Sequence, residues 1–294
     1  MILYLSNKNQ IRGDFIKSAV LRSDLAPIPV TLEAEIRTDE SMERLLNEGD
    51  IVTTGAGDAM RIVKSVQVTE RAAQGDRDVA YRRITAMLDA CHDVTFVRSR
   101  AIIKEGSSLA AIYRASGARL QAIDSDFPVP RFTCPIGDSP SFHIARVLQE
   151  EGGVVRWRLG KLNFMRLSDL FKQKPAANLP SNASDEVVSG FMERHEVSSF
   201  FSLNDAGAFA FGDTAKPRSV RYSPFKNTIR LRNMSQCLIL RKVMKTAYAG
   251  NLVAGDLINF TGGAPLAIIT AAHVFENGEE GNNQYTRLWL GALK

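Results

Sequence analysis

Gly49-Asp50-Ile51-Val52 and Gly255-Asp256-Leu257-Ile258 are two copies of one pattern, 206 residues apart in the chain. Each copy is followed by a glycine turn, a strand rich in isoleucine and valine, and a strand that opens on tyrosine. Turn chemistry, strand length and order are kept over about forty residues, which predicts two related small β-barrels. The further matches are Gly57 with Gly263, Ile62-Val63 with Ile268-Ile269, Val68 with Val274, and Tyr81-Arg82-Arg83-Ile84 with Tyr285-Thr286-Arg287-Leu288. The expected structural turns of the repeat are Gly49, Asp50, Gly57, Gly255, Asp256 and Gly263.

The rest of the chain divides around these copies. Strand signals fill residues 1–100, the first β-barrel, and alternate from Val30 to Ile36. Residues 101–172 have the pattern of an α+β module. A polar linker is expected over 173–190, and the second β-barrel over 191–294, with Thr228 to Leu231 as one of its strands. The predicted fold class is therefore mainly β with an α+β module between two related barrels.

Helix and turn signals locate the elements of the middle module. Ser107 or Ser108 caps a short helix that Gly117 ends. Asp138 or Ser139 offers the capping oxygen of a second helix, in which Pro140 suits the first turn and Gly152-Gly153 ends it. A hairpin turning at Gly160-Lys161 follows.

Composition and charge set limits on function. The chain has 294 residues, is 45% apolar and carries a formal net charge of +5. Basic residues such as Arg156 with Arg158, and Arg218 with Arg221, Arg230 and Arg232, are spaced as on solvated strand faces. No aromatic ladder accompanies them, which disfavours nucleic-acid binding. No apolar run approaches the ~20 residues of a membrane-spanning helix, and the first residues lack the pattern of a secretory signal.

Catalytic and metal-binding motifs are weak. Gly137-Asp138-Ser139 is similar to the GDS block of a serine esterase family, but Pro140 follows at a helix start and no histidine has aspartate three residues before it. The histidines are separated and the cysteines form no CxxC pair, so no cofactor, metal site or catalytic residue is expected. They are His92, His143, His195 and His273, with Cys91, Cys134 and Cys237.

Several blocks resemble modules of bacteriophage tail baseplate hub proteins, which are related to the hub barrels of type VI secretion spike proteins. Those in the middle of the chain are Pro130-Arg131-Phe132, the stretch from Gly137 to Gly153, Arg156-Trp157-Arg158 and the stretch from Gly160 to Phe164. The closing block runs from Asn251 to Ile258, continues at Ile268-Ile269 and ends at His273.

The resemblance implies a structural protein and not an enzyme. It implies a homotrimer that joins a sixfold tail tube to a threefold central spike, because three chains with two similar barrels each present six barrels in a ring. The implied partners are other copies of the chain, the tube protein, the spike protein and other baseplate proteins. Nucleic acid is implied only as a genome passing through the lumen, and no membrane is implied. The implied location is the virion tail, after synthesis in the host cytoplasm. A separate spike and a separate lysin would then be needed.

Two alternatives stay open at this stage. The barrels also suit a module that binds nucleic acid or a small ligand, which predicts basic and aromatic residues on one barrel face. A hydrolase in the middle module predicts a pocket with perturbed carboxylates or a Ser-His pair.

Overall fold

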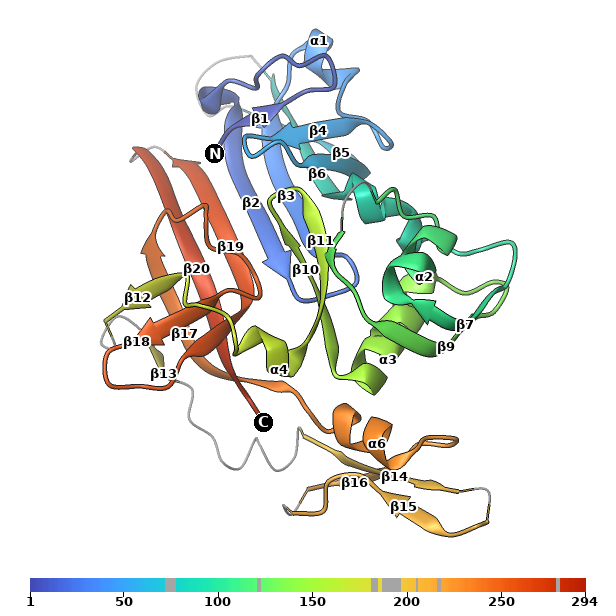
Figure 1. The fold of residues 1–294 in the computed structure, drawn as a ribbon. Helices are drawn as coiled ribbons and strands as arrows, with labels where there is room; N and C mark the ends of the chain where they lie inside the picture. The colour runs from blue at the N-terminus through green and yellow to red at the C-terminus, as the bar shows by residue number, and fades with distance from the viewer. Residues whose placement is uncertain are drawn as a thin grey trace.

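The computed structural model describes residues 1–71, 78–120, 123–180, 185–186, 197–204, 206–215, 218–278 and 281–294. A 12-stranded sheet forms the body of the molecule, and smaller sheets and short helices lie beside and below it (Figure 1). The predicted fold class, mainly β with an α+β module, is confirmed.

One half of the large sheet is the first six-stranded unit. Its strands are β1 (Leu3–Tyr4), β2 (Ile16–Asp24), β3 (Val30–Arg37), β4 (Ile51–Thr54), β5 (Ala59–Arg71) and β6 (Asp78–Leu88). Across the sheet they follow the order β1-β4-β5-β6-β3-β2. The alternation predicted for β3 is present, because its apolar residues are buried and the polar residues between them are half-buried or exposed.

A second six-stranded unit forms the other half. Its strands are β12 (Ala177–Leu179), β13 (Asp185–Glu186), β17 (Leu238–Ala247), β18 (Leu257–Phe260), β19 (Leu266–Gly278) and β20 (Gly281–Leu293). Their pairing order, β12-β18-β19-β20-β17-β13, is that of the first unit strand for strand, and the chain visits them in the same sequence. One difference is that β1 pairs antiparallel with β4, whereas β12 pairs parallel with β18. Both β12 and β13 fall within 173–190, where a linker was expected.

The repeat extends to strand register. A β-bulge interrupts the pairing of β5 with β6 between Ile62 and Lys64, and an equivalent bulge interrupts β19 with β20 between Ile268 and Thr270. Two residue pairs of β4 and β5 recur 206 residues later in β18 and β19. Bulges are specific features of a fold, so a shared bulge position is strong evidence that the two units have the same structure.

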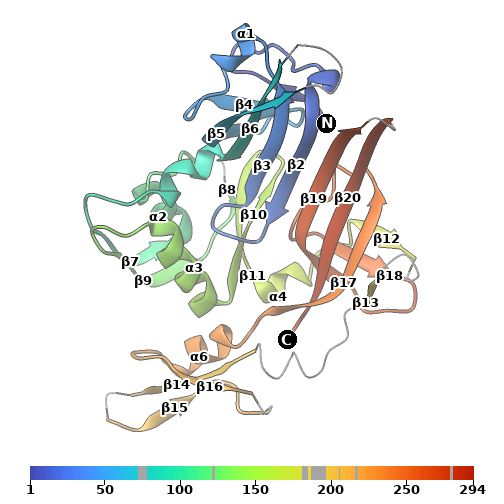
Figure 2. The same cartoon turned by 180° about the vertical axis from the view of Figure 1, so that it is seen from behind.

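The two units are joined edge to edge. Strand β2 of the first unit pairs antiparallel with β19 of the second, from Ser18 opposite Glu276 to Asp24 opposite Thr270. Figure 2 shows the two halves side by side across this joint. The repeated units thus share one sheet, an arrangement that the sequence pattern did not predict.

The α+β module lies between the units in the chain. Its elements are the 3₁₀ helix η2 (Asp89–Thr95), β7 (Ile102–Ser108), α2 (Leu109–Ala115), β8 (Ile123–Ser125), β9 (Pro128–Cys134), α3 (Pro140–Glu151), β10 (Gly153–Arg158), β11 (Lys161–Arg166) and α4 (Leu167–Leu170). The module packs on the first unit in one apolar core. At its centre the rings of Tyr113 and Phe164 are 5.0 Å apart, and the Tyr113 hydroxyl donates to the Pro27 carbonyl at 2.9 Å.

Helix ends in this module test the capping predictions. Ser108 caps α2 by accepting from the Ala111 amide at 3.3 Å, and Gly117 follows with φ +95°, both as predicted. Pro140 begins α3 and Gly152 ends it with φ +58°, also as predicted. The predicted capping oxygen is wrong, because the Ser139 side chain makes no capping bond.

The hairpin of β10 and β11 is confirmed, but its turn lies one residue earlier than predicted. The two turn residues are Leu159 and Gly160, with φ of +50° and +75°. Two consecutive positive φ values are those of a type I′ turn, whose twist matches that of the flanking strands.

A small lobe is inserted between β13 and β17. It consists of β14 (Ser199–Leu203), β15 (Phe209–Phe211), β16 (Val220–Tyr222) and α6 (Thr228–Met234). The strand predicted from Thr228 to Leu231 is therefore wrong. Asn227 instead caps a helix by accepting from the Arg230 amide at 3.0 Å, and Leu231 is fully buried. The lobe packs against α3 through α6, as Figure 1 shows.

Candidate functional site

The first glycine of each repeated turn has the same geometry. Gly49 and Gly255 have φ of +92° and +87°, a region that glycine enters without the steric cost of a Cβ atom. The Gly49 amide donates to the Ile62 carbonyl at 2.9 Å, and the Gly255 amide donates to the Ile268 carbonyl at 2.8 Å. Each turn precedes the fourth strand of its unit, β4 or β18, and is thus held to the fifth strand, β5 or β19.

The aspartate of each turn closes the loop before it. The Asp50 carboxylate accepts from the Asn47 amide at 2.9 Å, and the Asp256 carboxylate accepts from the Val253 amide at 3.2 Å. In both turns the carboxylate accepts from an amide three residues earlier, a local side-chain-to-backbone bond that aspartate readily makes, which explains why aspartate suits both positions. The structural reason for the Gly-Asp pair is therefore the same in both units.

The second glycine turn is similar but not identical. The Gly57 amide donates to the Thr54 carbonyl at 2.8 Å, and the Gly263 amide donates to the Phe260 carbonyl at 3.1 Å. In the first unit Gly57 itself has the positive φ, +90°, whereas in the second the positive φ, +77°, falls on Gly262.

The Gly-Asp turns of the two units differ in the arginine side chains that contact them. Asp256 is 4% exposed and forms ion pairs with Arg158 and, at 3.8 Å, with Arg156. Arg156 also donates to the Gly255 carbonyl at 3.1 Å. Burial lowers the pKa of Arg156, and the Asp256 carboxylate opposes this shift. Strand β10 of the α+β module is thereby clamped to the second unit.

In the first unit the corresponding cation comes from the unit itself. Arg61 of β5 donates to the Gly49 carbonyl at 2.8 Å and pairs with Asp89 at 2.6 Å. The sequence indicated that Arg156 lies on a solvated strand face, but its side chain is only 8% exposed. No local signal distinguishes this arginine from a surface one, because its carboxylate partner is 100 residues away in the chain.

Strands β5 and β13 of the large sheet each have an edge that carries no ladder among the described residues. Strand β5 pairs with β4 only as far as Arg61, so its outer edge from Lys64 to Val68 has no neighbouring strand among the described residues. Strand β13 pairs with β17 on one side and ends the strand order on the other. Unpaired strand edges of this kind accept a further strand.

In each unit, the connection between the third and fourth strands forms no ladder with the outer edge of the fifth strand among the described residues. In the first unit this connection carries Leu46, whose carbonyl accepts from the Ser65 hydroxyl at 2.6 Å. In the second it carries Leu252, whose backbone forms a hydrogen bond with His273. Both contacts use side chains of β5 and β19 and not their backbone ladders. The edge of β19 pairs with β2, and the equivalent edge of β5 has no neighbouring strand among the described residues.

His273 is the histidine that the fold buries most fully within the second unit. It is 4% exposed, and its Nδ1 lies 3.0 Å from the Thr286 hydroxyl. Burial lowers the pKa of His273, and the hydrogen bond with the Leu252 backbone opposes that shift. The described hydrogen bonds of His273 therefore both go to groups within the second unit.

The other predicted chemical groups are dispersed. His143 Nε2 lies 2.9 Å from the Asp138 carboxylate, and His92 Nδ1 lies 2.8 Å from the Asp93 carboxylate, in separate places. His195 lies outside the described residues. In the described part of the chain, no three His, Cys, Asp or Glu side chains gather as metal ligands would. Burial raises the pKa of the Cys91 thiol to about 12.

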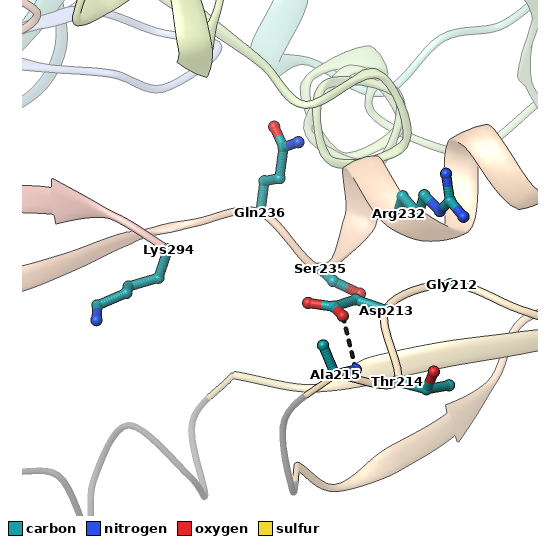
Figure 3. A pocket seen from close by; sticks show the side chains of 8 residues that line it. All are labelled: Gly212, Asp213, Thr214, Ala215, Arg232, Ser235, Gln236 and Lys294. Atoms are coloured by element: carbon teal, nitrogen blue, oxygen red, sulfur yellow. Dashed lines mark hydrogen bonds between the residues drawn. The ribbon is translucent and has the colours of Figure 1, made fainter.

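A pocket of about 560 Å³ lies where the lobe meets the C-terminal residue (Figure 3). Its carboxylate, on Asp213, accepts from the Ala215 amide at 2.9 Å and lies 3.9 Å from Arg218. The remaining wall includes Arg232 and Lys294. The acidic group of this pocket thus serves the loop that carries it.

The lobe presents aromatic side chains on the sheet face opposite α6. The ring of Phe201 lies 5.3 to 5.9 Å from the rings of Phe209, Phe211 and Tyr222. Phe209 and Tyr222 are more than half exposed.

None of the helices in the described ranges combines the length and the apolar composition that a membrane-spanning helix needs.

Comparisons with known proteins identify the fold. No family model and no curated protein matches the sequence. Solved structures do match over almost the whole chain. The tail protein from Neisseria meningitidis MC58 is 10% identical with a TM-score of 0.68, over 99% of this chain and 95% of its own. The 43 kDa tail protein of prophage MuSo2 from Shewanella oneidensis is 11% identical with a TM-score of 0.63, over 98% of this chain and 97% of its own.

A third match extends the likeness to secretion systems. The E. coli c3393 protein, a component of the type VI secretion system with structural similarity to the T4 bacteriophage tail proteins gp27 and gp5, is 9% identical. Its TM-score is 0.55, over 94% of this chain and 73% of its own. The chain thus has the fold of these phage tail proteins and of this type VI secretion component, as the sequence resemblance predicted.

Proposed function

We propose that this chain is a structural hub of a phage or phage-like tail baseplate, in which three copies form a ring between a sixfold tail tube and a threefold spike. The observation that carries the proposal is the duplicated six-stranded unit, with the same pairing order and the same bulge twice. Three such chains present six equivalent units, so one ring matches both symmetries.

The architecture supports this role over a binding or catalytic one. The two units lie side by side in one sheet, so the same strand order occurs twice along that sheet (Figure 2). The α+β module and the lobe extend from one side of that sheet (Figure 1). The partners in this proposal are other copies of the chain, the tube protein and the spike protein, and the site of action is the virion tail.

The six repeated turn residues have a structural role in this proposal. Gly49 and Gly255 hold the start of the fourth strand in each unit to the fifth strand. The two aspartates close the loop before the fourth strand, and the second glycines close the turn after it. The clamp from Arg156 and Arg158 to Asp256 then fixes the second unit on the module that packs against the first. A rigid spacing between the two units is what a pseudo-sixfold ring requires.

The test is the mass of the purified protein by light scattering, together with averaged electron micrographs. We expect a species of three times the 32.4 kDa chain mass and ring-shaped images in which six similar six-stranded units are visible. A chain that remains a monomer or dimer at every concentration, alone and with its tail proteins, would overturn the proposal.

A further inference from the structure

We infer that the seam between copies is a strand pairing in one defined register, in which β13 of one copy adds antiparallel to the outer edge of β5 of the next. Asp185 then lies opposite Val68, and Glu186 lies opposite Gln67. This inference rests on the proposed ring and names the surfaces and the alignment that build it.

The joint inside the chain is the template for the seam. There β2, the last strand of the first unit, lies against β19, with Val20 opposite Val274 and Leu21 opposite His273. Strand β13 is the last strand of the second unit, and β5 is the strand equivalent to β19. A ring that repeats one kind of joint at all six places therefore brings β13 against β5 of the neighbour.

The register on the β5 side follows from the 206-residue offset. His273 corresponds to Gln67 and Val274 corresponds to Val68. The bulges fall at the same offset, three to six residues earlier in each strand, so no residue is gained or lost between the bulge and these positions. The alignment is therefore fixed by structure as well as by sequence.

The register on the β13 side follows from ladder partners. Val20 lies opposite Glu33, which lies opposite Thr85 of β6. Asp185 lies opposite Val243, which lies opposite Trp289 of β20. Because β6 and β20 are equivalent with Thr85 at the place of Trp289, Asp185 takes the place of Val20. Glu186 takes the place of Leu21 in the same way.

The outer edge of β5 is available for this pairing. Residues 64–68 make no backbone hydrogen bonds beyond their ladder with β6 among those described. Lys64, Val66 and Gln67 are exposed, and Val66 is 41% exposed although it is apolar. An apolar side chain on an unpaired edge strand is a liability that a neighbouring strand removes. The edge of β5 thus has the features of an unfinished joint.

The test is disulfide cross-linking between two proteins that each carry one new cysteine, in a Cys237→Ala background. One protein carries Val68→Cys and the other Asp185→Cys, and the pair Gln67→Cys with Glu186→Cys is made in parallel. Neighbouring pairs of an antiparallel ladder alternate between Cα separations of about 5.5 and 4.5 Å, so at least one pair suits a disulfide. Mixing two proteins with tags of different mass ensures that every mixed product joins separate copies.

The matched control combines Val66→Cys with Asp185→Cys, a diagonal pair at roughly 7–8 Å that lies beyond normal disulfide reach. We expect mild oxidation to give roughly tenfold more mixed dimer from an in-register pair than from the control. A trimer in which neither in-register pair cross-links, or in which the control cross-links as well as they do, would refute the register but leave the hub proposal intact. A protein that is monomeric before oxidation would refute both.

Discussion

The two repeated aspartates provide a matched pair of substitutions whose effects should differ by a calculable amount. Asp50→Ala removes a turn hydrogen bond from the Asn47 amide, which contributes about 1 kcal/mol to the free energy of unfolding. Asp256→Ala removes the equivalent bond and also leaves Arg156 and Arg158 without their carboxylate. Breaking a buried ion pair costs about 3–5 kcal/mol, at the low end here because Arg158 is 34% exposed. We expect Asp256→Ala to destabilise the protein by about 3 kcal/mol more than Asp50→Ala, because both variants lose the turn bond and only Asp256→Ala loses the ion pairs.

The assay is urea unfolding followed by tryptophan fluorescence, to which both Trp157, between the two arginines in β10, and Trp289 of β20 contribute. Asp256→Asn is the control that separates the two terms, because its amide oxygen still accepts the turn bond but carries no charge. We expect it to recover the turn contribution only. Equal losses for the two alanine variants, within about 0.5 kcal/mol, would show that the clamp to the second unit contributes no more than an ordinary turn.

Two further predictions concern single residues. Gly117 has φ +95°, and an added Cβ would lie 3.0 Å from the Asp93 Cβ and would have to displace the end of the Arg98 side chain, 2.0 Å away. Gly57 has φ +90° and open space around it. Gly117→Ala should therefore lower the melting temperature clearly more than Gly57→Ala, and equal shifts would contradict the close approach to Arg98. Burial lowers the pKa of His273, so as the pH falls the unfolded chain binds a proton at this side chain before the folded chain does. The stability that depends on the neutral imidazole is therefore complete above about pH 6.5 and is lost as the pH falls towards the folded-state pKa. His273→Gln should lose less unfolding free energy than the wild type between about pH 7 and 5, and an identical pH dependence in denaturant titrations would contradict the burial argument.

Errors in the sequence predictions share a physical cause. The segment from Thr228 to Leu231 has β-branched and apolar residues typical of a strand, but the Asn227 cap and the packing of Leu231 against the lobe make it helical. The carboxylate of Asp138 was a candidate cap, yet it lies with the imidazole of His143 instead. Local propensity is weak compared with packing and specific hydrogen bonds, so such segments are decided by their surroundings.

The candidate site also depends on contacts between residues that are distant in sequence. The clamp on Asp256 brings together β10 and the turn before β18, which no local pattern connects. Strands β12 and β13 are short and lie in a polar stretch, so they show no hydrophobic alternation that would predict a strand. Their place in the sheet is set by the neighbours with which they pair.

By itself, the sequence determined that one β-fold occurs twice, because turn chemistry and side-chain alternation are properties of neighbouring residues and survive in the order of the chain. It also determined the first helix of the middle module through its cap and its terminal glycine. Only the tertiary structure decided that the two units share one sheet through β2 and β19, with edges of β5 and β13 that no described strand pairs. Pairing between strands 250 residues apart depends on which backbone edges meet in space, and an edge has no signature in the residues that form it.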